Sequence, residues 1–332
     1  MLFSIIALAS CTASEQPRIY SIQGPIMGTQ YQVKVVLTPD REQLLPHLQQ
    51  GIFDALTKVD RLMSTYKADS EISRFNRLGE LRWFDLSPET FEVIQLSQSL
   101  SEATGGAFDI TVGPLVNLWG FGPRYREDQV PAVEEIQRVR DYVGYQLLEL
   151  DESRYAIRKK HPELYIDLSA IAKGYAVDQV AEYLTDQSVQ DYLVEVGGEI
   201  RTSGVKPGNL PWRLAIEVPK ENQRAIEGVV EITGMAMATS GDYRNYYEQD
   251  GRRYSHTIDP TTGNPIVHTL ASVTVIHESC ALADGLATAF MVMGTKRAME
   301  YAVENGIAAY FIDRDGTDFR TAQTEQFSRF WK

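Results

Sequence analysis

A carboxylate and a hydroxyl lie four residues apart in a segment that is otherwise apolar. The segment Ala281–Ala289 is predicted to be helical, and it carries Asp284 and Thr288. Residues at i and i+4 share one helix face, and a carboxylate on an apolar helix is costly unless a cation or a hydrogen-bond donor meets it. Hard oxygen ligands at this spacing suit Mg²⁺, which takes few protein ligands and completes its shell from a phosphate substrate. The spacing therefore predicts a metal–phosphate site.

A second candidate for phosphate binding lies at a predicted helix start. We expect a short strand over Leu164–Asp167 and a helix over Ala170–Leu184, with Ser169 as its N-cap. Lys173 would lie in the first turn, where the macrodipole disfavours a cation but phosphate binds well. Gly174 costs roughly 1 kcal/mol relative to Ala inside a helix, which indicates close approach of another group. A solvated lysine beside a packing glycine is the alternative, and this segment alone favours neither.

Two further segments contain residue types that bind ligands. His256 ends a predicted hairpin over Asp242–His256, whose turn is Asp250-Gly251, and Asp259 follows shortly after. A lone histidine in a strand is more often structural than catalytic. Residues 105–122 are rich in glycine and aromatics, which suits either a planar ligand or a set of structural turns.

Strands and helices are predicted to be interleaved along the chain without a regular βαβ rhythm. This order favours an α+β fold. Residues 19–37 are predicted to form two strands joined by a turn, and Gly294 is predicted to end the helix that carries Asp284. Helices are also expected over Leu44–Met63, from the N-cap signal in Asp69-Ser70-Glu71, and from Ser87 to about Ala103; further strands are expected over Tyr192–Val196, Arg213–Val218, Val229–Ile232 and Ser272–Ile276.

Several function classes are excluded by composition and by missing motifs. The chain has 332 residues and a net charge of −13, which argues against a nucleic-acid partner because backbone binding needs clustered Lys and Arg. The sequence contains no phosphate loop of the Walker type, no Gly-x-Gly-x-x-Gly after a strand, no zinc-protease helix and no Gly-x-Ser-x-Gly elbow. Asp313-Arg314-Asp315-Gly316 lacks the downstream Glu of a calcium loop and predicts a hairpin turn.

The N-terminal residues resemble an export signal with a lipid attachment site. Leu2–Ala9 is apolar but too short to span a bilayer, and Leu8-Ala9-Ser10-Cys11 resembles a bacterial lipobox. A mildly apolar, frayed terminus is the alternative. Lipidation of Cys11 would leave Cys280 as the remaining cysteine, so an internal disulfide would be impossible. The predicted organisation is a signal peptide over residues 1–11, a tether over 12–18 and one domain over 19–332.

Eight short motifs, in their order along the chain, resemble those of the ApbE family of FAD:protein FMN transferases. They extend from about Ile22 to Phe311. The motifs are Met27-Gly28-Thr29, Met63-Ser64-Thr65-Tyr66, Gly106-Ala107-Phe108-Asp109, Asp167-Leu168-Ser169-Ala170-Ile171-Ala172-Lys173-Gly174, Glu195-Val196-Gly197-Gly198-Glu199, Thr239-Ser240-Gly241-Asp242-Tyr243-Arg244, Ser255-His256-Thr257-Ile258-Asp259-Pro260 and Ala283-Asp284-Gly285-Leu286-Ala287-Thr288.

The resemblance implies a fold and a set of site residues. The fold would be a single α+β flavin-transferase domain, similar to T-fold proteins, with FAD in a cleft between two lobes. Mg²⁺ would be bound by the backbone carbonyl of Ala170 together with Asp284 and Thr288, and His256 lies at the family position proposed to assist the chemistry. The residues expected to contact FAD are Met27, Tyr66, Ala107, Phe108, Asp109, Asp167, Lys173 and Ile258.

The resemblance also implies a reaction, with two alternatives. The pyrophosphate of FAD would be split, FMN would pass to a Thr or Ser hydroxyl of an acceptor flavoprotein, and AMP would be released. Either His256 or Asp259 would take the proton of the acceptor hydroxyl. Family acceptors are flavin-bearing subunits of membrane redox pumps. The alternatives are a Mg²⁺-dependent FAD pyrophosphatase, which yields free FMN and AMP, and a lipoprotein that stores intact FAD. The expected location is the bacterial cell envelope, on the periplasmic side of the inner membrane, held by a lipid anchor.

Overall fold

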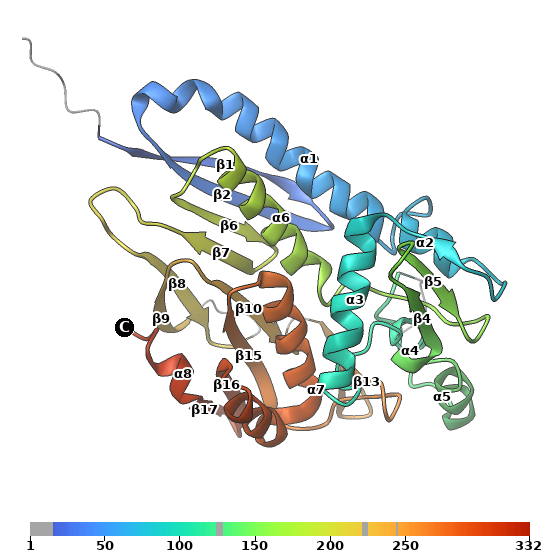
Figure 1. Cartoon of the computed structure of the whole chain (residues 1–332). Coiled ribbons are helices and arrows are strands. Elements are labelled where there is room, and N and C mark those ends of the chain that lie inside the picture. Colours follow the sequence, from blue (N-terminus) through green and yellow to red (C-terminus); the bar gives the residue numbers. More distant parts are fainter. Residues whose placement is uncertain (1–15, 124–128, 221–224, 244) are drawn as a thin grey trace, which may run out of the picture.

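The core of the protein is one eight-stranded antiparallel sheet (Figure 1). The computed structural model describes residues 16–123, 129–220, 225–243 and 245–332. The sheet is ordered β1-β2-β6-β7-β10-β15-β16-β17, and every neighbouring pair runs antiparallel. Its strands are β1 (Arg18–Ile26), β2 (Thr29–Leu37), β6 (Tyr192–Val196), β7 (Glu199–Ser203), β10 (Ala236–Gly241), β15 (Leu270–His277), β16 (Ala308–Asp315) and β17 (Asp318–Gln323).

Both faces of this sheet are covered. Side chains along each strand point alternately into two apolar cores, one on each face of the sheet. On one face lie the helices α1 (Leu45–Met63), α6 (Ala172–Asp186) and α7 (Cys280–Glu304), in front of the sheet in Figure 1. On the other face lie the hairpin of β8 (Trp212–Glu217) and β9 (Ile226–Ile232) and the short helix α8 (Glu325–Ser328). Successive strand residues point to opposite faces, so both sets of side chains are buried.

A smaller lobe packs beside α7. It contains α2 (Glu71–Asn76), α3 (Pro88–Ala103), α4 (Gly113–Leu118), α5 (Val133–Arg140) and the sheet β3-β5-β4, with strands β3 (Phe84–Asp85), β4 (Leu148–Asp151) and β5 (Ala156–Lys159). Two hairpins complete the strands, β11 (Tyr246–Gln249) with β12 (Arg252–Ser255) and β13 (Ile258–Asp259) with β14 (Asn264–Pro265). The segments η1 (Pro39–Leu44) and η2 (Tyr145–Leu147) are short 3₁₀ helices. Helices α4 and α5 share a third apolar cluster with these hairpins.

The structure confirms most of the predicted elements. The first hairpin turns at Met27 and Gly28, which both have positive φ (50° and 72°), and Ser70 and Ser87 cap α2 and α3 through their side chains. The hairpin at Asp250-Gly251 is also present. The α+β fold class is confirmed.

Three local predictions are wrong. Residues 164–167 form no strand, because the Ile166 amide bonds to the side chain of Asn76 instead of to a neighbouring strand. Helix α6 begins at Ala172, since Ser169 donates to the Asp167 carboxylate instead of capping the helix. Gly294 has φ 74° and ψ 162° and kinks α7, but a second helical segment continues to Glu304.

The N-terminal end of α7 packs against the first half of α6 and is hydrogen-bonded to it. The buried carboxylate of Asp178 on α6 accepts hydrogen bonds from the Cys280 and Ala281 amides at 3.0 Å each, which caps the start of α7. Arg201 on β7 pairs with the same carboxylate at 2.6 Å. Gly174 then allows the backbones to touch, since a Cβ there would lie 2.4 Å from the Cys280 carbonyl oxygen. The close approach predicted from Gly174 is confirmed.

Gly174→Ala is therefore expected to destabilise the fold by about 1–3 kcal/mol, although Ala favours helices, because the overpacked atoms are backbone and cannot rotate away. Urea unfolding midpoints measure the effect. Gly79→Ala is the matched control, since a Cβ there meets nothing within 4 Å. An unchanged midpoint in Gly174→Ala would contradict the steric argument.

The N-terminal predictions lie outside the described residues. Cys11, residues 1–11 and most of the tether fall in this part of the chain, and Arg244 of one motif is also not described. Among the described residues, no helix combines the length and the hydropathy needed to span a bilayer. Cys280 is a buried free thiol.

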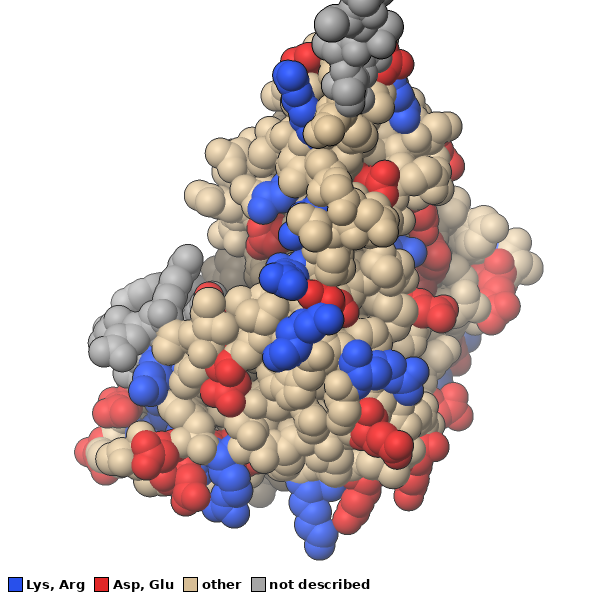
Figure 2. All heavy atoms as spheres, turned by 90° about the vertical axis from the view of Figure 1, so that its left-hand side faces the viewer, with Lys and Arg blue, Asp and Glu red and all other residues tan. Residues whose placement is uncertain are grey.

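The surface carries charges of both signs. On the face drawn in Figure 2, basic and acidic side chains are interspersed over the whole height of the molecule. With a net charge of −13, the overall field does not attract an anion. An anionic ligand therefore has to be held by local groups.

Candidate active site

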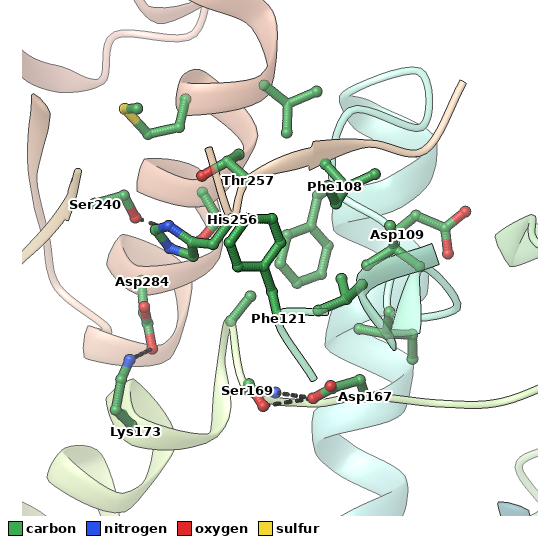
Figure 3. Close-up of a pocket in the computed structure, with 18 of the residues that line it drawn as sticks. Phe108, Asp109, Phe121, Asp167, Ser169, Lys173, Ser240, His256, Thr257 and Asp284 are labelled. Atoms are coloured by element: carbon green, nitrogen blue, oxygen red, sulfur yellow. Dashed lines mark hydrogen bonds and ion pairs between the residues drawn. The ribbon is translucent and has the colours of Figure 1, made fainter. Parts of the chain in front are cut away.

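A cavity of about 420 Å³ lies between the sheet with its helices and the smaller lobe. Its walls come from the loop around Phe108, the loop before α6, the end of β10, the segment after β12 and one face of α7. Figure 3 shows these segments converging from separate parts of the chain. The volume falls in the usual range of small-molecule sites.

The cavity brings together every predicted site residue in the described part of the chain except Met27. The lining residues that were predicted are Tyr66, Ala107, Phe108, Asp109, Asp167, Ala170, Lys173, His256, Ile258, Asp284 and Thr288. Tyr66 is 73% exposed and lies at the cavity mouth. Met27 lies in the β1–β2 turn and packs against the main core.

Lys173 is held between two carboxylates that come from different elements. Its Nζ lies 3.0 Å from Oε1 of Glu199 on β7 and 3.4 Å from Oδ2 of Asp284 on α7. Asp284 also accepts a hydrogen bond from the Gly174 amide at 3.1 Å. In Figure 3 the side chains of Lys173 and Asp284 point toward each other across the cavity wall. The carboxylate on the apolar helix thus has the cationic partner that its sequence context requires.

These contacts shift the pKa values of Lys173 and Glu199. Burial opposes the charge of Lys173, but the carboxylates of Asp284 and Glu199 outweigh it and raise the pKa of Lys173 above its ordinary value. Burial raises the pKa of Glu199, against the opposing effect of Lys173. Lys173 therefore stays protonated and positively charged at neutral pH.

The predicted Mg²⁺ ligands are compatible with the ion. No group of three or more His, Cys, Asp or Glu side chains capable of holding a metal is found in the described ranges. The predicted ligands would not form such a group, because they comprise one carboxylate, one hydroxyl and one backbone carbonyl. The Gly174 amide, which would reach the Ala170 carbonyl in a regular helix, donates to Asp284; no hydrogen bond between described residues uses that carbonyl. Among the described residues, the Thr288 hydroxyl has one side-chain hydrogen bond, to the Ser240 hydroxyl at 3.4 Å. Hard oxygen donors of this kind suit Mg²⁺.

His256 also lines the cavity, in a defined tautomer. Its Nδ1 is 2.9 Å from the Asn245 carbonyl oxygen. A carbonyl only accepts, so Nδ1 carries the hydrogen and Nε2 keeps its lone pair. Burial lowers the pKa of His256, partly offset by this hydrogen bond and by Asp242. The imidazole is thus neutral at pH 7 and able to accept a proton at Nε2.

The carboxylates of Asp109 and Asp167 are occupied by local hydrogen bonds. Asp109 is buried and accepts from the Thr111 amide and hydroxyl and from the Tyr145 amide at 2.7–2.8 Å. Burial raises the pKa of Asp109 despite these bonds. Asp167 accepts from the Ser169 amide at 2.9 Å, and Figure 3 shows this hydrogen-bonded pair, which also lines the cavity. Both carboxylates therefore shape the loops that line the cavity.

The remaining walls are apolar and aromatic. Phe108 and Phe121 face the cavity in Figure 3. Ile258 of β13 also lines the cavity. Phe121 also meets the His256 ring edge-on at a centroid distance of 6.3 Å and stacks on Tyr247. Such walls suit a planar ligand, as one interpretation of the aromatic-rich stretch 105–122 predicted.

Glu199, Ser240 and Thr257 also line the cavity, although no role was predicted for them from the sequence. Glu199 and Ser240 lie in quoted motifs, and the Gly-Gly pair before Glu199 was a signal for a tight turn beside a site. Gly197 and Gly198 have φ of 61° and 106°, and a Cβ on Gly197 would lie 3.4 Å from the Lys173 side chain.

Comparison with known proteins identifies the family. Residues 27–311 match the ApbE family. A FAD:protein FMN transferase of Vibrio cholerae is 45% identical over 329 residues, which are 99% of this chain and 97% of that protein. The chain belongs to the ApbE family. A FAD:protein FMN transferase of Escherichia coli K12 is 38% identical over 338 residues, covering 99% of this chain and 96% of that protein.

Solved structures of ApbE proteins agree with this fold. The flavin transferase ApbE from Vibrio cholerae has a TM-score of 0.87 at 44% identity, covering 95% of this chain and 99% of that one. The apo form of the flavinyl transferase ApbE from Pseudomonas stutzeri has a TM-score of 0.87 at 43% identity, covering 95% and 98%. The predicted family and its α+β fold are confirmed.

Proposed function

We propose that this ApbE protein transfers the FMN part of FAD to a Thr or Ser hydroxyl of an acceptor flavoprotein, with Mg²⁺, and releases AMP. One observation supports the proposal above all. A protonated lysine (Lys173), hard oxygen donors and a neutral histidine (His256) line one cavity that also has aromatic walls. Relatives that match almost the whole chain are named FAD:protein FMN transferases.

The reaction exchanges one bond to phosphorus for another. The bond between the FMN phosphorus and the bridging oxygen breaks, and the bridging oxygen leaves with AMP. A bond forms from the acceptor hydroxyl oxygen to the FMN phosphorus. His256 Nε2 takes the hydroxyl proton, because Nδ1 is already committed to the Asn245 carbonyl. Loss of this proton makes the hydroxyl a stronger nucleophile.

Lys173 and the predicted Mg²⁺ ligands would offset the negative charge of the phosphates. Lys173 supplies a fixed positive charge near the start of α6, where helix amides also favour an anion. Mg²⁺ held by Asp284, Thr288 and the Ala170 carbonyl would act as a Lewis acid on phosphate oxygens. The aromatic residues Phe108 and Phe121 would flank a planar ring. Tyr66 at the mouth would limit access of water.

The proposal includes a location and a class of partner. Acceptors would be flavin-bearing subunits of membrane redox pumps, and a lipid on Cys11 would hold the enzyme at the periplasmic side of the inner membrane. The lipobox-like sequence before Cys11 supports this location. Mass spectrometry of the mature protein extracted from membranes would detect the lipid.

Incubation with FAD, Mg²⁺ and a fragment of an acceptor flavoprotein is expected to add the mass of one FMN to the acceptor and to release AMP in equal amount. Intact-protein mass spectrometry measures the first product and chromatography the second. The control acceptor has its Thr or Ser replaced by Ala. Free FMN without acceptor modification would mean hydrolysis, unchanged FAD would mean storage, and either result would overturn transfer.

A further inference from the structure

The ammonium group of Lys173 lies closer to one of its two carboxylate partners than to the other. Its ammonium lies 3.0 Å from Glu199 and 3.4 Å from Asp284, so the nearer partner is the residue that was not expected to bind anything. The two carboxylate side chains are 6% and 4% exposed, whereas that of Lys173 is 29% exposed. One cation with a solvent-facing side is therefore shared by two buried carboxylates.

Because Lys173 is shared between two carboxylates, it competes less strongly with a metal ion for the carboxylate of Asp284. Charge-assisted hydrogen bonds are normally 2.7–2.9 Å long, so the 3.4 Å contact is a loose one. Without a second carboxylate, the ammonium would be free to close on Asp284 and to neutralise it. A metal would then have to displace a tight ion pair in a site of low dielectric, which weakens its binding.

Glu199 has the position and the chemistry to prevent this closure. It begins β7 directly after the Gly197-Gly198 turn, while Lys173 and Asp284 belong to α6 and α7. Its Oε1 accepts from Lys173, and its Oε2 is buried with no hydrogen-bond partner among the described residues. Glu199 lines the cavity, so a donor brought by the ligand, such as water in the shell of an ion, would satisfy this oxygen.

We infer that Glu199 is a positioning residue that holds the Lys173 ammonium off Asp284 and thereby keeps Asp284 open to Mg²⁺. The inference rests on the proposed function, in which Asp284 is a metal ligand. It assigns Glu199 no contact with the reacting atoms. Its effect passes through Lys173 and should disappear when Lys173 is removed.

Direct metal binding tests the inference without recourse to turnover. Mn²⁺ replaces Mg²⁺ as the probe, because both prefer oxygen ligands and free Mn²⁺ is counted by electron paramagnetic resonance. The full chain is titrated with Mn²⁺ with and without FAD, acceptor omitted. Glu199→Gln is expected to weaken Mn²⁺ binding about 10-fold to 100-fold, the usual effect of altering residues behind metal ligands. Glu199→Asp, which keeps the charge, should lose less.

The double variant Glu199→Gln/Lys173→Met distinguishes positioning from a general structural role. Removing the competing cation should restore Mn²⁺ affinity to within about threefold of the parent chain. A double variant as weak as Glu199→Gln, or a Glu199→Gln chain that binds like the parent, overturns the inference. If Glu199→Gln does not fold, the double variant, which removes both members of the pair, still gives this comparison with Glu199→Asp and the parent.

Asp284→Asn separates failure of the inference from failure of the proposed function. Loss of Mn²⁺ binding in Asp284→Asn with normal binding in Glu199→Gln refutes only the role of Glu199. Normal Mn²⁺ binding in Asp284→Asn refutes the metal site on which the proposed function depends.

Discussion

Asp284→Asn is expected to lower the rate of FMN transfer at least about 100-fold, because a Lewis acid on a phosphate oxygen is worth several kcal/mol and each 1.36 kcal/mol is a factor of ten. The amide keeps the shape of the side chain but loses the charge that binds the ion. Asp284→Ala should lose at least as much. The measurement is the initial rate of acceptor modification over a range of Mg²⁺ concentrations, and high Mg²⁺ should recover little of it.

The substitution also removes a partner of Lys173 and of the Gly174 amide. Thermal unfolding must therefore accompany the rate measurement, so that loss of fold is not mistaken for loss of metal. Asp318→Ala, at an exposed aspartate that begins β17, is the matched control and should be indistinguishable from the parent chain. Full activity in a folded Asp284→Asn chain would rule out Asp284 as a metal ligand.

His256→Ala is expected to lower kcat about 10²-fold to 10⁴-fold with little change in the affinity for FAD, as loss of a general base does. The neutral imidazole is the active form, and burial lowers its pKa. Activity of the parent chain should therefore persist below pH 6.5, the ordinary His value, and fall only as the pH drops through the lowered pKa. This acidic limb should be absent from the variant.

The pH–rate profile of transfer and a flavin-binding titration provide the two readouts. His47→Gln is the matched control, since His47 is exposed, bonds to Gln187 and lies outside the cavity. An acidic limb that survives in His256→Ala would assign the titration to another group. A kcat close to that of the parent would remove His256 from proton transfer.

Local patterns predicted most elements because their causes are local. Ser70 and Ser87 bond to amides three residues ahead, and the Met27-Gly28 turn needs positive φ at adjacent positions. The prediction was wrong at 164–167 because Asn76, ninety residues earlier in the chain, supplies the hydrogen-bond partner of Ile166. Side chains so distant in sequence leave no periodic signal.

Residue spacing along the chain was enough to predict which residues share a helix face and which charges lie at a helix start. Asp284 and Thr288 line one cavity because a helix repeats every 3.6 residues, and Lys173 lies in the first turn of α6. Resemblance of short motifs to the ApbE family added the identity of the family, which the comparisons confirm.

The pairing of Lys173 with two carboxylates depends on packing between elements that are distant in the chain. Lys173 is 26 residues from Glu199 and 111 from Asp284 in the chain, and packing of α6 against α7 and β7 sets the two distances of 3.0 and 3.4 Å. The tautomer of His256 likewise depends on the Asn245 carbonyl across a hairpin. Electrostatic interactions depend on separation and burial, and neither is encoded in residue spacing along the chain.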